Sequence, residues 1–344
     1  MSFKRHGYRK NLEKIMTPIK FNSFFLSSKS YLRLMFRRSR EHIDYSYPLL
    51  IVSGLQRSGT SLVTQLLHNH PQILSYFAEL HIGRPNKYHW PELTDKKNVK
   101  EKFSTLIPLN LANKFLAIND YDNFVFDFGF FKSLFLKLER NNSSGRQRDT
   151  LNNFFTAYFN AYLNCNHSNF YDRYKFIVAS VPGLTLFNES ISGFVRDYPE
   201  GRVLVMIREP LQWWNSARHH SKNLKEKGLE RYKTSLKNTF EACNQYPKNV
   251  FVVSFDNLIK DTEKSAKLIL ERSGLKFNKI STYPSNFPYY GKDNSTFGHK
   301  KTNKVLTDKL NRKPDIPHSD QLYINDHLYP NYLDIMKKHV INQL

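Results

Sequence analysis

The chain has 344 residues, long enough to bury a large core either as one α/β domain with insertions or as two smaller domains. Its 52 Lys and Arg outnumber its 30 Asp and Glu, and the net charge of +22 favours phosphates, sulfates, nucleic acid or an anionic membrane surface as partners. Two cysteines, Cys165 and Cys243, are too few for a disulfide framework and lack metal-ligand spacing, so we expect buried thiols in a reducing compartment.

Residues 1–46 form a basic N-terminal segment without an apolar stretch long enough for a secretory signal. We interpret this segment as a solvated arm. The alternative is an amphipathic anchor that associates weakly with an anionic membrane. No apolar run in the sequence approaches the ~18 residues that would span a bilayer. The expected location is therefore the cytoplasm, with peripheral membrane association as the alternative.

From residue 47 onwards, short apolar runs alternate with helical patterns. The run from Tyr47 to Gly54 is continuous and ends in glycine, which is typical of a strand buried on both faces of a parallel sheet. Alternating strands and helices predict an α/β fold with three layers around a central parallel sheet. The further predicted strands are 73–78, 174–181, 202–207 and 250–255, and the predicted helices are 60–68, 184–197, 210–224 and 261–273.

Residues 47–344 are predicted to form one domain, interrupted at 80–172 by an insertion rich in aromatic residues and helical patterns. Between Leu151 and Leu163 the apolar side chains follow i, i+3, i+4, i+7 spacing, which predicts a helix with a wide apolar face. Such a stripe is typical of a core, and we expect the insertion to cover one end of the sheet.

The loop from Gly54 to Ser61 lies between a predicted strand and a predicted helix, the context in which a glycine-spaced loop can bind an anion. Its two glycines have the spacing of the nucleoside triphosphatase loop, but Thr60 stands where that loop needs lysine. The backbone N–H groups of residues 58–61 would still converge at the helix N-terminus, where a phosphate is favoured. The cation lies inside the loop, as Arg57.

The segment from Gly54 to Pro71 resembles the 5′-phosphosulfate loop and following helix of sulfotransferases. The resemblance is closest to the Arg-Ser-Gly-Thr versions found in tyrosylprotein and several carbohydrate sulfotransferases. It implies a P-loop-type fold and 3′-phosphoadenosine 5′-phosphosulfate (PAPS) as co-substrate. The loop residues that the resemblance assigns to this cofactor are Gln56, Arg57, Ser58, Gly59, Thr60 and Ser61.

A second anion site is predicted where the strand at 202–207 ends. Arg208 there can make bidentate contacts with a phosphate, Pro210 begins a helix, and Ser216 lies about two turns along it. In sulfotransferases an Arg and a Ser with this spacing bind the 3′-phosphate of the cofactor, which implies the same for Arg208 and Ser216. The segment 250–261 also resembles the family. Residues 293–301, with Lys300, match its C-terminal phosphate loop more weakly and equally suit an exposed turn.

Sulfuryl transfer depends on in-line positioning and on stabilising the negative charge that grows on the departing phosphate oxygen. Arg57 and the N–H groups beside it are placed to hold that charge, and no metal is required. Family members take the general base from just beyond the second strand, which implies Glu79, with His81 in reserve. Four other histidines lack a recognisable orienting partner and are expected at the surface, in turns or beside a phosphate: His68, His70, His219 and His220.

The acceptor is expected between the carboxyl edge of the sheet and the insertion. A carbohydrate is favoured because that class of acceptor is broad and because several aromatic residues could stack on sugar rings: Tyr88, Trp90, Tyr121, Phe124, Phe126 and Phe128. Core packing would explain most of these aromatic residues equally well. A tyrosine-containing protein or a lipid-like alcohol are the other acceptors considered.

Two other classes of protein were weighed. A nucleoside kinase or triphosphatase would need a lysine at position 60 and a magnesium carboxylate, for which only Asp256 is available. A nucleic-acid-binding protein would explain the charge. However, no helix-turn-helix, zinc finger or aromatic ribonucleoprotein motif accompanies it, so no nucleic-acid partner is expected.

Overall fold

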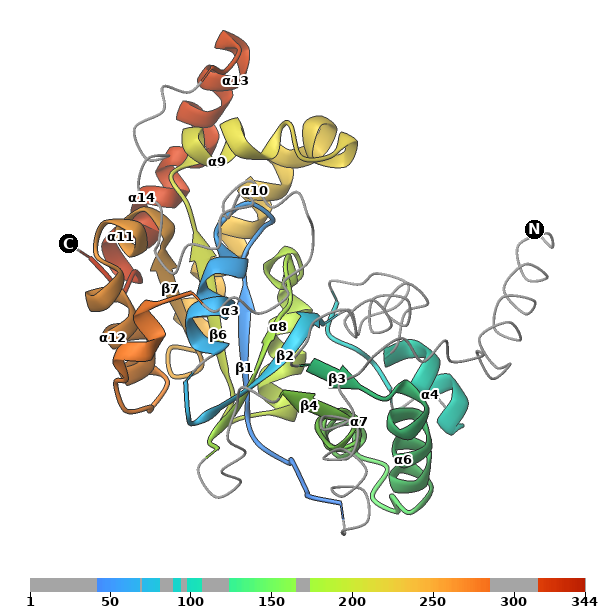
Figure 1. The fold of residues 1–344 in the computed structure, drawn as a ribbon. Coiled ribbons are helices and arrows are strands. Elements are labelled where there is room, and N and C mark those ends of the chain that lie inside the picture. The colour runs from blue at the N-terminus through green and yellow to red at the C-terminus, as the bar shows by residue number, and fades with distance from the viewer. Residues whose placement is uncertain are drawn as a thin grey trace, which may run out of the picture.

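Five parallel strands form the central sheet, in the order β2-β5-β1-β6-β7 (Figure 1). The computed structural model describes residues 42–68, 70–80, 89–93, 98–106, 124–164, 174–284 and 315–343. Most of the predicted arm lies outside these residues. The strands are β1 (Leu49–Ser53), β2 (Ile73–Glu79), β5 (Phe176–Ser180), β6 (Arg202–Ile207) and β7 (Val250–Ser254).

Every residue of β1, β5 and β7 is buried, as their continuous apolar sequences predict for the interior of a parallel sheet. Successive side chains of β1 enter different cores. Leu50 and Val52 pack with α3 (Thr60–His68), α11 (Phe255–Lys260) and α12 (Thr262–Arg272). Leu49 and Ile51 pack in the opposite core, which contains α7 (Gln147–Ala161), α8 (Asn188–Asp197), α10 (Lys222–Gln245) and α14 (Tyr329–Lys338). The predicted three-layer α/β fold is therefore confirmed, with helices on both faces of the sheet (Figure 1).

The helices on the α3 side are α3 (Thr60–His68), α11 (Phe255–Lys260) and α12 (Thr262–Arg272). The remaining helices of the fold outside the insertion are α8 (Asn188–Asp197), α9 (Pro210–Ala217), α10 (Lys222–Gln245), α13 (His318–Tyr323) and α14 (Tyr329–Lys338). Short helical turns lie at Leu184–Leu186 (η3), Lys279–Thr282 (η4) and Ile324–Leu328 (η5).

Two predicted helices are divided in the structure. The predicted helix 184–197 forms η3 and α8, with an extended Phe187 between them. The sequence predicted a single helix over 210–224, but α9 ends at Ala217 and α10 begins after Ser221. The His220 N–H bonds to the Ala217 carbonyl at 3.0 Å, and the Ser221 hydroxyl caps α10 by accepting the Leu224 N–H at 3.3 Å. Because serine favours helix N-caps, this local chemistry starts a new helix at Lys222.

The insertion contains α4 (Val99–Leu106), α6 (Phe128–Arg140) and α7 (Gln147–Ala161), with a small antiparallel pair of β3 (Phe124–Phe126) and β4 (Tyr162–Asn164). It joins the main core through α7, where Phe155 and Tyr158 pack against Tyr76 of β2 with ring centroids 6.0 and 4.7 Å away. The predicted apolar helix is therefore a core helix.

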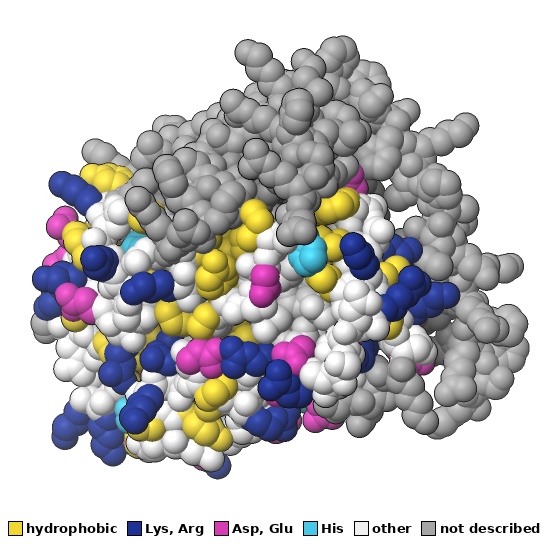
Figure 2. Space-filling view, turned by 90° about the horizontal axis from the view of Figure 1, so that it is seen from below, with side chains coloured by type: hydrophobic (Ala, Val, Ile, Leu, Met, Phe, Trp, Pro, Cys, Tyr) yellow, Lys and Arg dark blue, Asp and Glu magenta, His cyan; other side chains and the backbone are white. Residues whose placement is uncertain are grey.

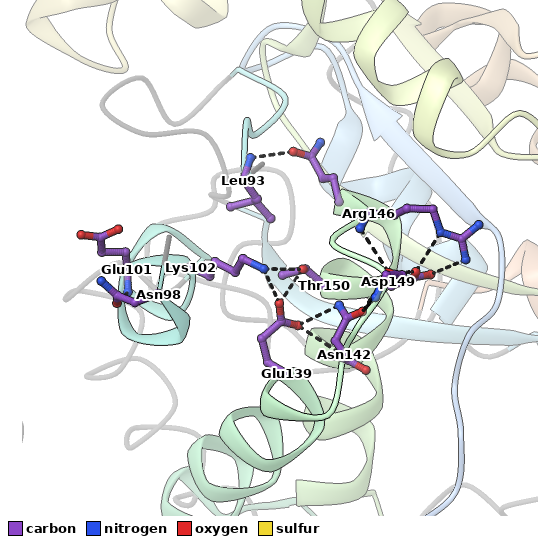
Figure 3. Close-up of polar contacts among 12 residues, drawn as sticks. Leu93, Asn98, Glu101, Lys102, Glu139, Asn142, Arg146, Asp149 and Thr150 are labelled. Carbon is purple, nitrogen blue, oxygen red and sulfur yellow. Dashed lines mark hydrogen bonds and ion pairs between the residues drawn. The ribbon is translucent and has the colours of Figure 1, made fainter. Parts of the chain in front are cut away.

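A buried carboxylate ties the helices of the insertion together (Figure 3). Glu139 of α6 accepts hydrogen bonds from Lys102 of α4 at 2.5 Å and from the Thr150 hydroxyl of α7 at 2.8 Å. Its second oxygen accepts from Asn153 of α7 at 3.0 Å. Because a buried charge must be paired and hydrogen-bonded, this cluster fixes the three helices relative to one another.

The excess of Lys and Arg in the sequence is visible at the surface of the protein. Figure 2 shows the molecule from below the view of Figure 1, with dark-blue Lys and Arg side chains spread widely over the described part of this face. None of the described helices is both long enough and apolar enough to cross a membrane. Cys243 has a free, buried thiol, as predicted.

Candidate active site

The loop between β1 and α3 depends on its two glycines. A Cβ on Gly54, where φ is 130°, would lie 2.4 Å from the Met206 carbonyl oxygen. A Cβ on Gly59, where φ is 96°, would lie 2.2 Å from the Phe255 ring. Only glycine tolerates both the backbone conformation and the close approach. The loop is thereby pressed against the ends of β6 and β7.

Arg57 is a non-glycine residue of this loop with a left-handed backbone, at φ 75°. Such a conformation is strained for a residue with a Cβ and is characteristic of functional sites. It places the Arg57 side chain and carbonyl toward the junction between β6 and α9, which contains Arg208. The Arg57 Nε donates to the Ser216 hydroxyl at 3.0 Å, and the Arg57 carbonyl accepts from the Arg208 Nη1 at 3.3 Å.

The structure thus brings the two predicted anion sites together at the carboxyl edge of the sheet, where ligands bind in open α/β folds. Burial lowers the pKa of both Arg57 and Arg208, and for Arg208 the nearby Arg57 charge lowers it further. Arginine nevertheless stays protonated in proteins. Two partly desolvated cations side by side form a site that an anion would stabilise.

Two buried hydrogen-bond donors at this junction, the Ser58 hydroxyl and the Arg208 Nε, have no partner among the described residues. Ser58 is fully buried in the loop. A buried donor without a partner lowers the stability of a protein. Phosphate oxygens would pair with these two donors and remove that cost. The helix N-terminus that begins at Thr60 adds backbone N–H groups with the same preference.

Two carboxylates, those of Asp256 and Glu209, lie close to Arg208. The Asp256 carboxylate accepts the Glu209 N–H at 2.9 Å, and Glu209 caps α9 by accepting the Gln212 N–H at 2.7 Å. Burial raises the pKa of Asp256, while the Arg208 charge opposes that shift. The Arg208 guanidinium lies 4.6 Å from the centre of the Phe255 ring. These contacts stabilise the segment at the end of β6 that contains Arg208.

A cleft of about 1070 Å³ opens beside the loop. Glu79, at the end of β2, lines it together with Gln56 and His220. The other lining residues come mainly from α10 and are largely polar: Ser221, Asn223, Leu224, Glu226, Lys227, Glu230, Arg231 and Thr234, with Leu186 and Phe187. Glu79 therefore faces the same space as the loop, as its predicted role requires.

His220 also lines this cleft, and the sequence analysis did not assign it a catalytic role. Burial, followed by the Arg57 charge, lowers the pKa of His220, and the Glu79 carboxylate partly offsets this. His220 thus lies within electrostatic reach of both proposed catalytic groups. The available signal was its position about one helical turn beyond Ser216, which places it toward the same edge.

Some predicted site residues lie outside the described residues, and others lie away from the cleft. His81 and Lys300 lie outside the described residues. Trp90 is 5% exposed; its Nε1 donates to Asp197 at 2.7 Å and its ring packs edge-on against Phe194. Phe126 is also in the core. Of the two readings of these aromatic residues, core packing therefore holds for Trp90 and Phe126, which offer no open face to a sugar.

The sequence profile of the sulfotransferase family matches residues 48–279, which include β1, the loop, Glu79, Arg208 and Ser216. The chain belongs to this family. It is therefore an enzyme of the sulfotransferase class, and membership implies PAPS as the sulfuryl donor. The two junctions described above lie within the matched region.

Solved structures of other sulfotransferases are similar to this one at low sequence identity. The sulfotransferase domain from the curacin biosynthetic pathway is 13% identical, with 81% of this chain and 97% of that chain covered and a TM-score of 0.47. The sulfotransferase domain of the Synechococcus PCC 7002 olefin synthase is 15% identical, with 83% and 97% covered and a TM-score of 0.48. Among curated proteins, none matches this chain.

Proposed function

We propose that this sulfotransferase moves the sulfuryl group of PAPS to a hydroxyl of a carbohydrate, at the junction of the Gly54–Gly59 loop with the start of α9. One observation carries the proposal: Arg57, Arg208 and Ser216 meet across the sheet edge, next to buried donors that have no partner among the described residues. A ligand with phosphate oxygens at both ends of a ribose would satisfy this set of donors.

Each junction takes one end of the cofactor in this proposal. The Ser58 hydroxyl and the backbone N–H groups of residues 58–61 bind the 5′ end, because they combine unpaired donors with a helix N-terminus. Arg208 and Ser216 bind the 3′-phosphate, the arginine through its Nε and terminal nitrogens. Lys300 stays a predicted third contact on that phosphate.

PAPS supplies the sulfuryl group, whose bond to the phosphate oxygen breaks as a bond to the acceptor oxygen forms. Arg57 stabilises the negative charge that grows on the departing oxygen, together with the neighbouring N–H groups. Glu79 accepts the acceptor's proton, since it lines the cleft on the side where an acceptor would approach the loop. No step in this mechanism uses a metal ion. His81 stays the reserve base.

The proposal of a carbohydrate acceptor now rests on the cleft rather than on the aromatic residues of the insertion. Its walls offer carboxylates, amides, hydroxyls and cations from α10, with Phe187 as an apolar surface. A polyhydroxylated acceptor can pair with many such groups at once. A tyrosine side chain or lipid-like alcohol would leave most of them unpaired, which costs binding energy.

The kinase alternative fits less well. Thr60 occupies the lysine position, and Asp256, the one magnesium carboxylate that the sequence suggested, already accepts the Glu209 N–H under Arg208. The direct test is the melting temperature of the full chain with 3′-phosphoadenosine 5′-phosphate, ATP or duplex DNA. The proposal predicts stabilisation by the first ligand at concentrations where the others have little effect. Stabilisation by ATP and magnesium, or by DNA alone, would overturn it.

A further inference from the structure

Tyr232 of α10 contacts the junction between β6 and α9, which contains Arg208 and is called the 3′ junction below. Its hydroxyl accepts a hydrogen bond from the Arg208 N–H at 3.1 Å and donates one to the Arg208 carbonyl at 2.5 Å. A single side-chain group thus satisfies both backbone groups of the residue that leaves β6. Tyr232 is 1% exposed, so water cannot take over either bond.

The ring of Tyr232 reaches the second junction through one intermediate side chain. It stacks on the Trp213 indole with centroids 4.2 Å apart and ring planes at 27°. The Trp213 Nε1 donates to the Gln56 carbonyl at 3.0 Å. Gln56 directly precedes Arg57, whose left-handed backbone needs support from its surroundings. One residue of α10 therefore contacts the 3′ junction directly and the 5′ loop through Trp213.

These contacts are needed because of where Arg208 lies. It follows the last residue of β6 and precedes the first turn of α9, so its N–H and carbonyl leave the ladder before a helix begins. Without a partner, these buried groups would shift to find one, and the guanidinium would move with them. Burial raises the pKa of Tyr232 well above its usual range, so the hydroxyl keeps the proton that it donates.

We propose that Tyr232 is a positioning residue that holds Arg208 for the 3′-phosphate through its hydroxyl, and holds the Gln56–Arg57 loop through Trp213. The inference rests on the proposed assignment of Arg208 to the 3′-phosphate. Tyr232, which belongs to neither anion site, would then set the distance between the two sites. Two variants, Tyr232→Phe and Trp213→Phe, can test the two halves separately.

The experiment is calorimetric titration of the full chain with 3′-phosphoadenosine 5′-phosphate and with adenosine 5′-phosphate, which lacks the 3′-phosphate. Tyr232→Phe keeps the ring and its stacking but removes the hydroxyl. It should weaken binding of the first ligand about 10-fold and leave the second within about 2-fold. Trp213→Phe removes the donor to Gln56 and should weaken both ligands by a similar factor, about 3- to 10-fold.

Tyr198→Phe is the matched control. Tyr198 is also fully buried, and its hydroxyl donates to Asn152 at 2.9 Å, away from both junctions. Loss of this hydrogen bond should lower stability but leave both affinities unchanged. A merely structural role for Tyr232 would produce the same result as this control, whereas a positioning role changes the ratio between the two ligands.

The outcomes separate the two claims. A folded Tyr232→Phe protein with the wild-type ratio of affinities overturns the positioning role. If that variant does not fold, Trp213→Phe decides: equal weakening supports the link to the loop, and unchanged affinities overturn it. If wild type itself binds both ligands equally, the proposed 3′-phosphate site fails, and the role of Tyr232 fails with it.

Discussion

The Nε of Arg57 donates a hydrogen bond to the hydroxyl of Ser216 at 3.0 Å, which joins the loop after β1 to the helix after β6. Parallel strands β1 and β6 are direct neighbours in the sheet, so their carboxyl ends deliver both residues to the same edge. The contact links the two proposed phosphate sites through one side-chain hydrogen bond. A change at either residue should therefore affect both ends of the cofactor.

Arg208→Ala should weaken binding of 3′-phosphoadenosine 5′-phosphate, because it removes charge-assisted contacts to the 3′-phosphate. The expected loss is about 1.5–3 kcal/mol, or about 10- to 150-fold in affinity by calorimetry. Arg146→Ala, which removes an equal charge from the exposed pair with Asp149, is the control and should change little. Unchanged affinity in a folded Arg208→Ala protein would exclude Arg208 from the site.

Glu79→Gln should leave cofactor affinity nearly intact and lower kcat about 10²- to 10⁴-fold, the usual contribution of a positioned general base. Glu263→Gln alters an exposed carboxylate of α12 that does not line the cleft, and it should keep kcat close to wild type. Steady-state transfer assays with saturating donor give both values. If Glu79→Gln keeps kcat within a few-fold of wild type, the base lies elsewhere, and His81 becomes the next variant to measure.

His220 should make the stability of the free enzyme depend on pH. Burial and the Arg57 charge lower its folded-state pKa below the unfolded value of about 6.5, so the unfolded chain binds the proton more readily. Stability is therefore retained above about pH 6.5 and falls as the pH drops through this value toward the lower folded pKa. His220→Gln should show a smaller fall in melting temperature between pH 7.5 and about 5.5. Parallel curves for the two proteins would contradict the assignment.

Gly59→Ala should destabilise the protein more than Gly145→Ala, although both glycines have positive φ. The added methyl at Gly59 would lie 2.2 Å from the Phe255 ring, whereas nothing lies within 4 Å at Gly145. Backbone strain should cost each variant about 1–2 kcal/mol, and overpacking should add about 1–3 kcal/mol at Gly59 alone. Urea denaturation measures the difference. Equal losses would show that the loop can move away from Phe255.

Local sequence predicted the parts of the fold that depend on local physics. The buried strands follow from continuous apolar runs such as Leu49–Ser53, and the loop follows from glycines between a strand and a helix. The break at Ser221 was missed, although residues 218–223 contain no apolar side chain and a serine is itself a helix-start signal.

The contacts that assemble the site could not be predicted, because they join residues far apart in the chain. Tyr232 lies 24 residues beyond Arg208, and Trp213 lies 157 residues beyond Gln56. No period or motif connects such positions. Trp90 shows the reverse case: an aromatic residue suggests a sugar-stacking surface until its burial against Phe194 is known.

Sulfate transfer by an Arg57→Ala protein tests the central claim most directly. Radiolabelled PAPS is incubated without magnesium with a panel of glycans, phenols and tyrosine peptides, and transfer by wild type, Arg57→Ala and Arg57→Lys is compared. Arg57→Ala should lose about 10²- to 10³-fold in turnover, more than in donor affinity, because its contacts strengthen as charge develops. Arg57→Lys should recover part of the loss, since lysine restores the charge without the planar fork. Transfer by Arg57→Ala at the wild-type rate would contradict the account.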